Sequence, residues 1–440
     1  MRPDIQKIYD EKLMTAAEAV RLIRSGDRVF AGKASSVPYG LLEALWNRRH
    51  ELEGVTVMSA NAYQASPIYD EDEDNPFLFS TFFMGVNERK QRKRLSYTSV
   101  HLSLMDQWSE DIGRPDVALF EVSPPDEDGY CCFGPSGVAA GYRVRELSDR
   151  VILQVNRNTP YILGEKNLVH ISDADAICEI DTPYDRYEVM EPDEISKQIA
   201  RHIMQEIPDG ATIQLGLGNI STAIGYELHK RSELGIHTEL LNQPMVELMR
   251  SGNVTNTRKG YLDGKTVFSF SLGNPDLYAE MDHNEQFYVV PFRMSNDPRL
   301  IAKNRNMISI NATMALDLWG EAASECMNWK QYSGVGGQLD FVRGAQWSEG
   351  GKSFIATTSS FMKNGKRVSK IVPYFGPGTP VTTPRADIQY VATEYGCVNL
   401  KTLTMEDRAR AMISIAHPDF REELIAAAER QKIWRQSNKR

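Results

Sequence analysis

Glycines and carboxylates stand at the ends of apolar runs in four segments of the sequence, and these residue types could do chemistry. The first segment, QLGLGNIS at residues 214–221, places glycines after a strand-like run and before a helix-like one. Glycine lets backbone N–H groups approach a ligand, and a helix N-terminus favours anions. The segment lacks the third glycine of a dinucleotide fingerprint, and the chain has no Gly-x-x-x-x-Gly-Lys-Ser/Thr motif of an ATP site. The pattern predicts either an anion-binding turn or a tightly packed one.

The second segment, GIHTE at residues 235–239, ends in a carboxylate. Glu239 follows an apolar strand at its carboxyl edge, where open α/β sheets place their ligands. From this position, Glu239 could act as a nucleophile, a general base or a salt-bridge partner. His237 lies two residues earlier, so in one continuous strand both side chains would point to the same face. A lone histidine of this kind is more often a satisfied polar residue than a catalyst.

The third segment, YSGVGGQLDFVRGA at residues 332–345, holds three glycines in four positions. Such a run cannot form a regular strand without cost, and it suggests backbone amides pressed against a ligand, as in an oxyanion site. Asp340 and Arg343 in the same segment either pair with each other or serve the site.

The fourth segment, residues 381–400, carries Glu394 before a glycine turn. Glu394 is either catalytic or a buried charge held by Arg385. Two charge runs are also present. We expect the acidic run at 70–74 to be a solvated loop. The basic run at 88–95 is either an exposed face or an attractor of a ligand phosphate.

The elements that must position these residues follow a strand, turn, helix, strand order twice, as in βαβ units. SGDRVFAG in the first half resembles DGATIQLG in the second, and ELEGVTV resembles SELGIHT. This weak internal duplication, offset by about 180 residues, predicts an α/β fold of two related, open, mainly parallel domains. A proline- and acid-rich stretch places their boundary near residues 182–193, giving domains 1–188 and 189–440.

Composition excludes several protein classes. The 440 residues are 41% hydrophobic and 25% charged, which argues against disorder and fibrous repeats. The net charge of -9 has the wrong sign for a general nucleic-acid binder. The five cysteines include no C-x-x-C pair, so we expect neither a disulfide framework nor a metal site. With no apolar run long enough for a transmembrane helix and a polar N-terminus, we expect a cytoplasmic protein without membrane or nucleic-acid partners.

Taken together, five stretches resemble the acetyl-CoA hydrolase/transferase family of class I CoA-transferases, above all its 4-hydroxybutyrate and butyryl-CoA:acetate CoA-transferases. The resemblance covers nearly the whole chain in the right order, and the third glycine-rich stretch is its most specific part. The stretches are HTELLNQPMVELMRSGNVTN, YSGVGGQLDFVRGA, SKIVPYFGPGTPVTTPRADIQYVATEYG, IAHPDFREEL and VSPPDEDGYCCFG.

The resemblance implies a role for individual residues. Glu239 matches the family's nucleophilic glutamate, which carries CoA as a glutamyl thioester. Gly334 and Val335 would support the oxyanion from the loop that precedes the second CoA-binding segment. The residues implied to contact CoA are Gly216, Leu217, Gly218, Asn219, Ile220, Asn311, Gly336 and Gly337.

The resemblance also implies a reaction. The enzyme would move CoA between an acyl-CoA, such as acetyl-, butyryl-, 4-hydroxybutyryl- or succinyl-CoA, and a free short-chain carboxylate by a ping-pong mechanism. The active site would lie between the two domains, usually in a homodimer or homotetramer. CoA would be a substrate, with no permanently bound cofactor. An acyl-CoA hydrolase using the same glutamate is the alternative, and a non-catalytic CoA-binding protein a remote one.

One departure leaves the substrate open. The 4-hydroxybutyrate-type enzymes usually read close to S-D-G after the glutamate, where this chain has Asn242-Gln243-Pro244. Proline removes an N–H and fixes φ, so the loop behind the nucleophile must differ. We expect the acyl pocket to be lined from the first half, around residues 31–37, 59–66 and 133–140.

Overall fold

The computed structural model describes residues 1–70, 74–111, 113–184 and 190–434. Its internal contacts divide the chain into two compact units. The first unit comprises Met1–Glu188, Glu239–Gln243 and Lys265–Ser295, and the second comprises Val189–Thr238, Pro244–Gly264 and Asn296–Arg440. A single cut at residue 188 therefore does not describe the division, because two later segments join the first unit.

A seven-stranded parallel sheet forms the centre of the first unit, in the order β4-β3-β2-β1-β5-β7-β9. Its central strands are buried on both faces, as expected for a parallel sheet covered by helices. The strand order reverses between β1 and β5, the position where open α/β sheets bind ligands. The strands are β1 (Arg28–Lys33), β2 (Thr56–Ala60), β3 (Leu78–Thr81), β4 (Leu95–Tyr97), β5 (Val117–Val122), β7 (Arg150–Val155) and β9 (Ala176–Glu179).

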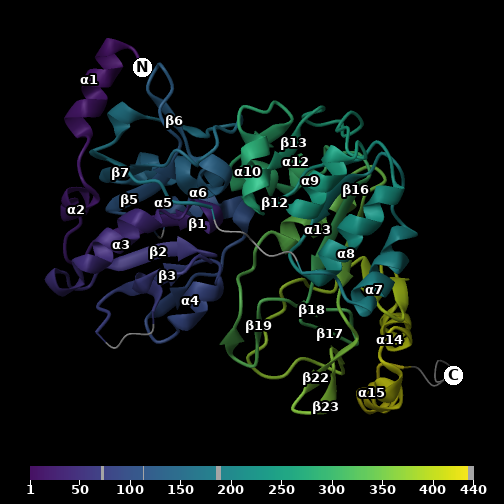
Figure 1. The fold of residues 1–440 in the computed structure, drawn as a ribbon. Coiled ribbons are helices and arrows are strands. Elements are labelled where there is room, and N and C mark those ends of the chain that lie inside the picture. Colours follow the sequence, from purple (N-terminus) through teal and green to yellow (C-terminus); the bar gives the residue numbers. More distant parts are fainter. Residues whose placement is uncertain (71–73, 112, 185–189, 435–440) are drawn as a thin grey trace. The chain divides into compact units, whose positions relative to one another are not determined.

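Helices and short strand pairs complete the first unit (Figure 1). Thr15 and Glu18 form a capping box at the start of α2, in which the side chain of each residue accepts a hydrogen bond from the backbone N–H of the other, at 3.3 and 2.9 Å. The α-helices are α1 (Pro3–Lys12), α2 (Ala16–Ala19), α3 (Tyr39–Asn47), α4 (Val86–Lys90), α5 (Met105–Asp111), α6 (Gly134–Leu147), α10 (Pro275–Met281) and α11 (Phe292–Ser295). The 3-10 helices are η1 (Val20–Leu22), η2 (Ala34–Ser36), η3 (Arg49–Glu51), η4 (Pro67–Tyr69), η5 (Leu102–Leu104) and η6 (Ile171–Asp173). The pairs are β6 (Tyr130–Cys132) with β8 (Leu168–His170), β12 (Leu240–Asn242) with β14 (Phe270–Leu272), and β13 (Thr266–Phe268) with β15 (Phe287–Val289).

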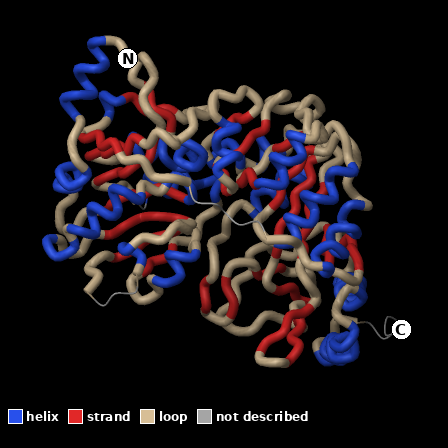
Figure 2. The backbone as a smooth tube through the Cα atoms, in the orientation of Figure 1, coloured by secondary structure: helices blue, strands red, loops and turns tan. Residues whose placement is uncertain are grey.

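A six-stranded sheet in the order β11-β10-β16-β21-β25-β26 forms the centre of the second unit. All its neighbours are parallel except the last pair. Helices and strands alternate along each unit (Figure 2), which confirms the predicted α/β class. The strands are β10 (Thr212–Leu215), β11 (Gly235–Ile236), β16 (Met307–Ala312), β21 (Lys352–Ala356), β25 (Tyr390–Thr393) and β26 (Gly396–Asn399).

The helices of the second unit include α7 and α8, which pack side by side (Figure 1). Pro418 is the first residue of the last helix, a position that proline favours. The helices are α7 (Glu194–Met204), α8 (Asn219–Glu227), η7 (Leu228–Lys230), α9 (Gln243–Arg250), α12 (Pro298–Ile301), α13 (Gln338–Trp347), α14 (Met405–Ser414) and α15 (Pro418–Arg430). The remaining strands are β17 (Ala315–Asp317), β18 (Ala322–Ala323), β19 (Cys326–Met327), β20 (Lys330–Gln331), β22 (Ser360–Lys363), β23 (Lys366–Ser369) and β24 (Ile371–Val372).

The expectation of one continuous strand through residues 235–241 is wrong. β11 ends at Ile236 and pairs with β10, whereas β12 begins at Leu240 and pairs with β14 in the other unit. Because the chain leaves one sheet before it joins another, His237 and Glu239 are not alternate positions of one strand. Among the described residues, no helix is both long and apolar enough to cross a membrane.

Candidate active site

The glycine turn after β10 opens directly into the N-terminus of α8. Gly216 N–H donates to the Ile310 carbonyl at 2.9 Å, so the turn lies beside the end of β16. Gly218 has φ +111° and ψ 176°, which L side chains rarely adopt, and its Cα faces open space. The turn therefore presents backbone N–H groups and a helix N-terminus, the arrangement that suits an anionic ligand.

Asn311 lies next to this turn, as a Cβ on Gly216 would be 3.6 Å from its Oδ1. Its amide is fixed by two buried polar side chains. Asn311 Nδ2 donates to Ser309 Oγ at 3.0 Å, and Gln214 Nε2 donates to Asn311 Oδ1 at 3.2 Å. A satisfied buried network of this kind gives the amide one orientation. No role was predicted from the sequence for Gln214 or Ser309. The available signal was that each is a polar residue inside an otherwise apolar run, TIQL and MISINA respectively.

The second glycine-rich segment also leads into a helix. Gly336 has φ +62°, and Gly337 is the N-cap of α13. α13 packs against β16 and β21, two parallel neighbours that it connects. A helix between parallel strands runs opposite to them, so its N-terminus lies at the carboxyl edge of the sheet. Within the second unit, residues 216–220, Asn311 and residues 334–337 thus belong to the same sheet edge.

Glu239 stands in the first unit, held through its backbone. Its carbonyl accepts hydrogen bonds from Ser269 N and Phe270 N, both at 3.1 Å. Ser269 is itself fixed, because its Oγ lies 2.6 Å from both the Val290 carbonyl and Ser295 Oγ. The Glu239 side chain is neither fully buried nor fully exposed. The backbone is therefore hydrogen-bonded at one of the positions where the chain passes from the second unit to the first.

Lys33, at the end of β1, is a buried cation that sequence reasoning missed. Its Nζ lies 3.8 Å from the centroid of the Phe270 ring. Burial lowers its pKa to about 8, while the negative charges of Glu239 and Glu88 oppose that shift. A lysine that closes the apolar run VFAG was the available signal. The ammonium thus stands beside the segment that carries Glu239.

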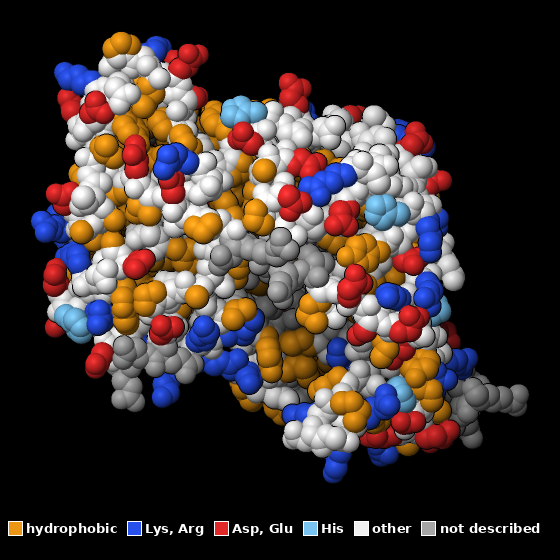
Figure 3. Space-filling view, viewed as in Figure 1, with side chains coloured by type: hydrophobic (Ala, Val, Ile, Leu, Met, Phe, Trp, Pro, Cys, Tyr) orange, Lys and Arg blue, Asp and Glu red, His pale blue; other side chains and the backbone are white. Residues whose placement is uncertain are grey.

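Glu88 begins the basic run 88–95, yet it is buried and serves the fold. Its carboxylate accepts hydrogen bonds from Gly85 N at 2.8 Å, Ala62 N at 3.0 Å and Ser59 Oγ at 3.1 Å. Lys90, Arg92 and Lys93 of the run are exposed. Basic side chains gather on the surface around α4 (Figure 3). This arrangement agrees with the alternative in which the basic run is an exposed face.

The structure contradicts two of the alternatives that the sequence left open, namely that Arg343 pairs with Asp340 and that Arg385 holds Glu394. Arg343 pairs with Asp387, with Nε and Oδ1 2.9 Å apart, because Arg343 faces solvent whereas Asp340 on the same helix is buried. The Glu394 carboxylate accepts bonds from Ser359 N at 2.8 Å and Ser359 Oγ at 2.6 Å. Arg385 instead lies over the Trp319 ring, 4.6 Å from its centroid.

His237 has the environment of a core residue. It is buried, and its ring lies 5.9 Å from that of Tyr261 and 6.2 Å from that of Phe341. No group of three or more His, Cys, Asp or Glu side chains that could hold a metal occurs among the residues that the structure describes. Within that part of the chain, the cysteines are unbridged.

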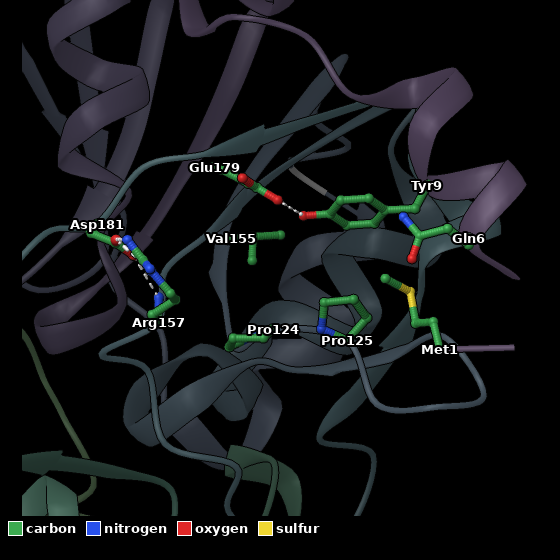
Figure 4. A pocket seen from close by; sticks show the side chains of 9 residues that line it. All are labelled: Met1, Gln6, Tyr9, Pro124, Pro125, Val155, Arg157, Glu179 and Asp181. Atoms are coloured by element: carbon green, nitrogen blue, oxygen red, sulfur yellow. Dashed lines mark hydrogen bonds and ion pairs between the residues drawn. The ribbon is translucent and has the colours of Figure 1, made fainter.

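A separate cavity of about 600 Å³ lies in the first unit, beyond the ends of β7 and β9 (Figure 4). Tyr9 reaches into it from α1 and donates to Glu179 at 2.8 Å, and Arg157 pairs with Asp181. Its charges are therefore paired with one another. None of the residues predicted to act on CoA lines this cavity.

Comparison with known proteins gives a consistent result. The model of the acetyl-CoA hydrolase/transferase N-terminal domain matches residues 1–184, and that of the C-terminal domain matches residues 273–428. The butyryl-CoA:acetate CoA-transferase of Anaerostipes caccae is 37% identical, over 98% of this chain and 99% of its own. The succinyl-CoA:cyclohexane-1-carboxylate CoA transferase of Geobacter metallireducens is 39% identical, over 97% of each chain. The crystal structure of RipA from Yersinia pestis superimposes with a TM-score of 0.90 at 37% identity, covering 98% of this chain and 100% of that one.

Proposed function

Because the chain belongs to the acetyl-CoA hydrolase/transferase family, we propose that it transfers CoA from an acyl-CoA to a free short-chain carboxylate, with Glu239 as the nucleophile. The observation that carries this proposal is that Glu239 follows β11 by three positions in the chain, and that the carboxyl edge of the sheet containing β11 holds two glycine-led helix N-termini. Two residues, His237 and Thr238, lie between Ile236 at the end of β11 and Glu239, so the Cα atoms of Ile236 and Glu239 are at most about 11 Å apart.

The chemistry explains why a carboxylate suits this position. Glu239 Oε attacks the thioester carbonyl, the C–S bond breaks, and an acyl-glutamyl anhydride and CoA thiolate form. The thiolate then attacks the glutamyl carbonyl, giving glutamyl-CoA and releasing the first acid as a carboxylate. An incoming carboxylate reverses these steps and leaves as the new acyl-CoA. The anhydride and the glutamyl thioester both remain activated acyl groups, so the free energy of the original thioester is retained. A serine ester would be too stable to return the acyl group to CoA.

The glycine segments supply the remaining functions. We propose that the turn at 216–220 and the amide of Asn311 contact CoA, whose anionic groups suit the N-terminus of α8. Backbone N–H groups of residues 334–337 would stabilise the oxyanion of each tetrahedral step. Loss of one such donor raises the barrier by roughly 3 kcal/mol. No step needs a metal or a permanently bound cofactor, so CoA enters and leaves as a substrate.

The proposal is tested by trapping the intermediate. The protein is incubated with butyryl-CoA, treated with borohydride to reduce a glutamyl thioester, and digested for peptide mass mapping. We expect the reduced residue to be Glu239 and the Glu239→Gln variant to show neither label nor turnover. Glu394→Gln is the matched control, because that carboxylate is engaged by Ser359, and it should keep the label. A label on Glu394 would contradict the assignment of Glu239 as the nucleophile.

Initial-rate kinetics separate transfer from hydrolysis. When acetate is varied at several fixed concentrations of butyryl-CoA, a transferase gives parallel double-reciprocal lines. It forms acetyl-CoA and butyrate, and it releases no free CoA. Release of CoA at a rate independent of acetate would instead identify a hydrolase that uses the same glutamate.

We also expect a homodimer or homotetramer. Large apolar side chains remain exposed on the second unit, among them Trp329 at 82% and Trp347 at 60%. Exposed aromatic surface of this kind is typical of protein interfaces. Sedimentation equilibrium measures the assembly state directly, and a monomer at micromolar concentration would contradict this expectation.

A further inference from the structure

Lys33 presents an ammonium group that the protein itself does not satisfy. The side chain is only 5% exposed, and its Nζ is surrounded by ring faces. The distance from Nζ to the Phe270 ring centroid is 3.8 Å. The centroids of the Phe292, Phe83 and Phe82 rings lie 5.4, 5.6 and 5.7 Å from Nζ. Among the residues that the structure describes, Nζ makes no hydrogen bond and no ion pair within 4.0 Å. An ammonium has three N–H donors, and none of them meets an acceptor of the described chain, so they are open to a ligand.

The neighbouring carboxylates do not take this role. Glu88 already accepts three hydrogen bonds from Gly85, Ala62 and Ser59. Glu239 acts on Lys33 only at longer range, and its backbone is bonded to Phe270, whose ring carries the ammonium. The cation therefore stands next to the proposed nucleophile with its N–H groups available.

We infer that Lys33 binds a second carboxylate of the substrate, so that the transferred acyl group belongs to a short dicarboxylic acid. This inference rests on the proposed function, because it places the acyl group at Glu239. The four phenylalanine rings would enclose the methylene chain and strengthen the charge pair by excluding water.

A second carboxylate fits better than the reacting one. The reacting carboxylate loses its charge when it becomes an anhydride or a thioester, and Glu239 loses its own charge in glutamyl-CoA. The buried ammonium would then lose the negative charges of Glu239 and of the reacting carboxylate during the cycle and keep only that of Glu88, which is unfavourable. The distal carboxylate of a dicarboxylic acid stays charged in both the free acid and the thioester.

The test compares succinate with butyrate as acceptors from acetyl-CoA. The measured quantity is the ratio of kcat/KM for succinate to kcat/KM for butyrate in the wild type, Lys33→Met, Lys33→Arg and Lys7→Met. We expect the wild type to prefer succinate and Lys33→Met to lower the ratio about 100-fold, the usual effect of removing one partner of a buried charge pair. Lys33→Arg should retain part of the preference. Lys7→Met, with a side chain 78% exposed on α1, should keep the wild-type ratio.

Each other outcome is decisive. A wild type that prefers butyrate, or an equal fall of both kcat/KM values in Lys33→Met, overturns the inference. In the second case Lys33 would act on Glu239 or on the reacting carboxylate. Borohydride labelling of wild-type Glu239 by butyryl-CoA distinguishes this failure from failure of the proposed function. A label present with an unaltered ratio rejects only the role of Lys33, whereas an absent label rejects Glu239 as the nucleophile.

Discussion

Replacing Lys33 by methionine is expected to stabilise the ligand-free protein. Burial lowers the Lys33 pKa from 10.5 to about 8, so holding its charge in the folded chain is unfavourable. One pKa unit corresponds to about 1.4 kcal/mol, which makes the cost roughly 3 kcal/mol at neutral pH. Loss of the ring contacts offsets about 0.5–2 kcal/mol of that gain. We therefore expect Lys33→Met to raise the free energy of unfolding by about 1–3 kcal/mol at pH 7.

The pH dependence gives the sign of the effect independently. Because the Lys33 pKa is lower in the folded chain, the unfolded chain binds more protons between about pH 8 and pH 10.5. The wild type therefore carries the full penalty below pH 8 and loses it as the pH rises toward 10.5. The advantage of Lys33→Met should shrink over the same interval.

Urea unfolding of the two proteins at pH 7 and pH 10 measures this difference, with Lys7→Met as the exposed control. Succinate at 1,000 times its Kd should reverse the order, since a ligand at that concentration adds about 4.1 kcal/mol to the stability of the protein that binds it. A variant less stable than the wild type at pH 7, or a difference that does not change between the two pH values, would refute the reasoning.

Three further substitutions test other parts of the structure. Burial raises the pKa of Glu121 to about 7, so its contribution to stability is present below pH 4.5 and lost as the pH rises through 7. Glu121→Gln should be more stable than the wild type at pH 8 by up to roughly 3 kcal/mol and gain nothing at pH 4.5, as measured by urea midpoints; equal pH slopes would contradict this. Gly218→Val forces a side chain into φ +111° at a strain of about 1–3 kcal/mol. It should raise the KM for acyl-CoA about tenfold or more, and an unchanged KM would remove the turn from the CoA site. Ser359→Ala deletes a hydroxyl that donates to Glu394 at 2.6 Å, and it should lower stability by about 1–2 kcal/mol while Glu239 labelling persists. Loss of that labelling would give Glu394 a role in the chemistry.

Local rules of chain conformation predicted much of the framework. The Thr15 capping box, the helix start at Pro418 and the glycine-led entry into α8 depend on residues close in sequence, and all three are present in the structure. The alternation of strands and helices likewise predicted the α/β class, because each βαβ unit is specified within a few tens of residues. The resemblance to the family implied that Glu239 is the nucleophile.

Long-range packing decided the rest. Glu394 accepts hydrogen bonds from Ser359, 35 residues away, instead of being held by Arg385. Arg343 pairs with Asp387, 44 residues away, although Asp340 is nearer in the sequence. The run through Glu239 is divided between two sheets, because β11 pairs with β10 whereas β12 pairs with β14, and both partners lie elsewhere in the sequence. No local pattern could reveal that Lys33 ends among four phenylalanine rings from distant segments.

The sequence by itself determined the class of fold, the family and the carboxylate that we propose as nucleophile. These depend on periodicity, on turn residues and on short motifs that can be recognised in a linear chain. Only the tertiary structure decided which charges are paired, which are left to a ligand and where a strand passes from one sheet to the other. Burial and electrostatic pairing are properties of side chains brought together by folding, and their energies do not exist until those side chains meet.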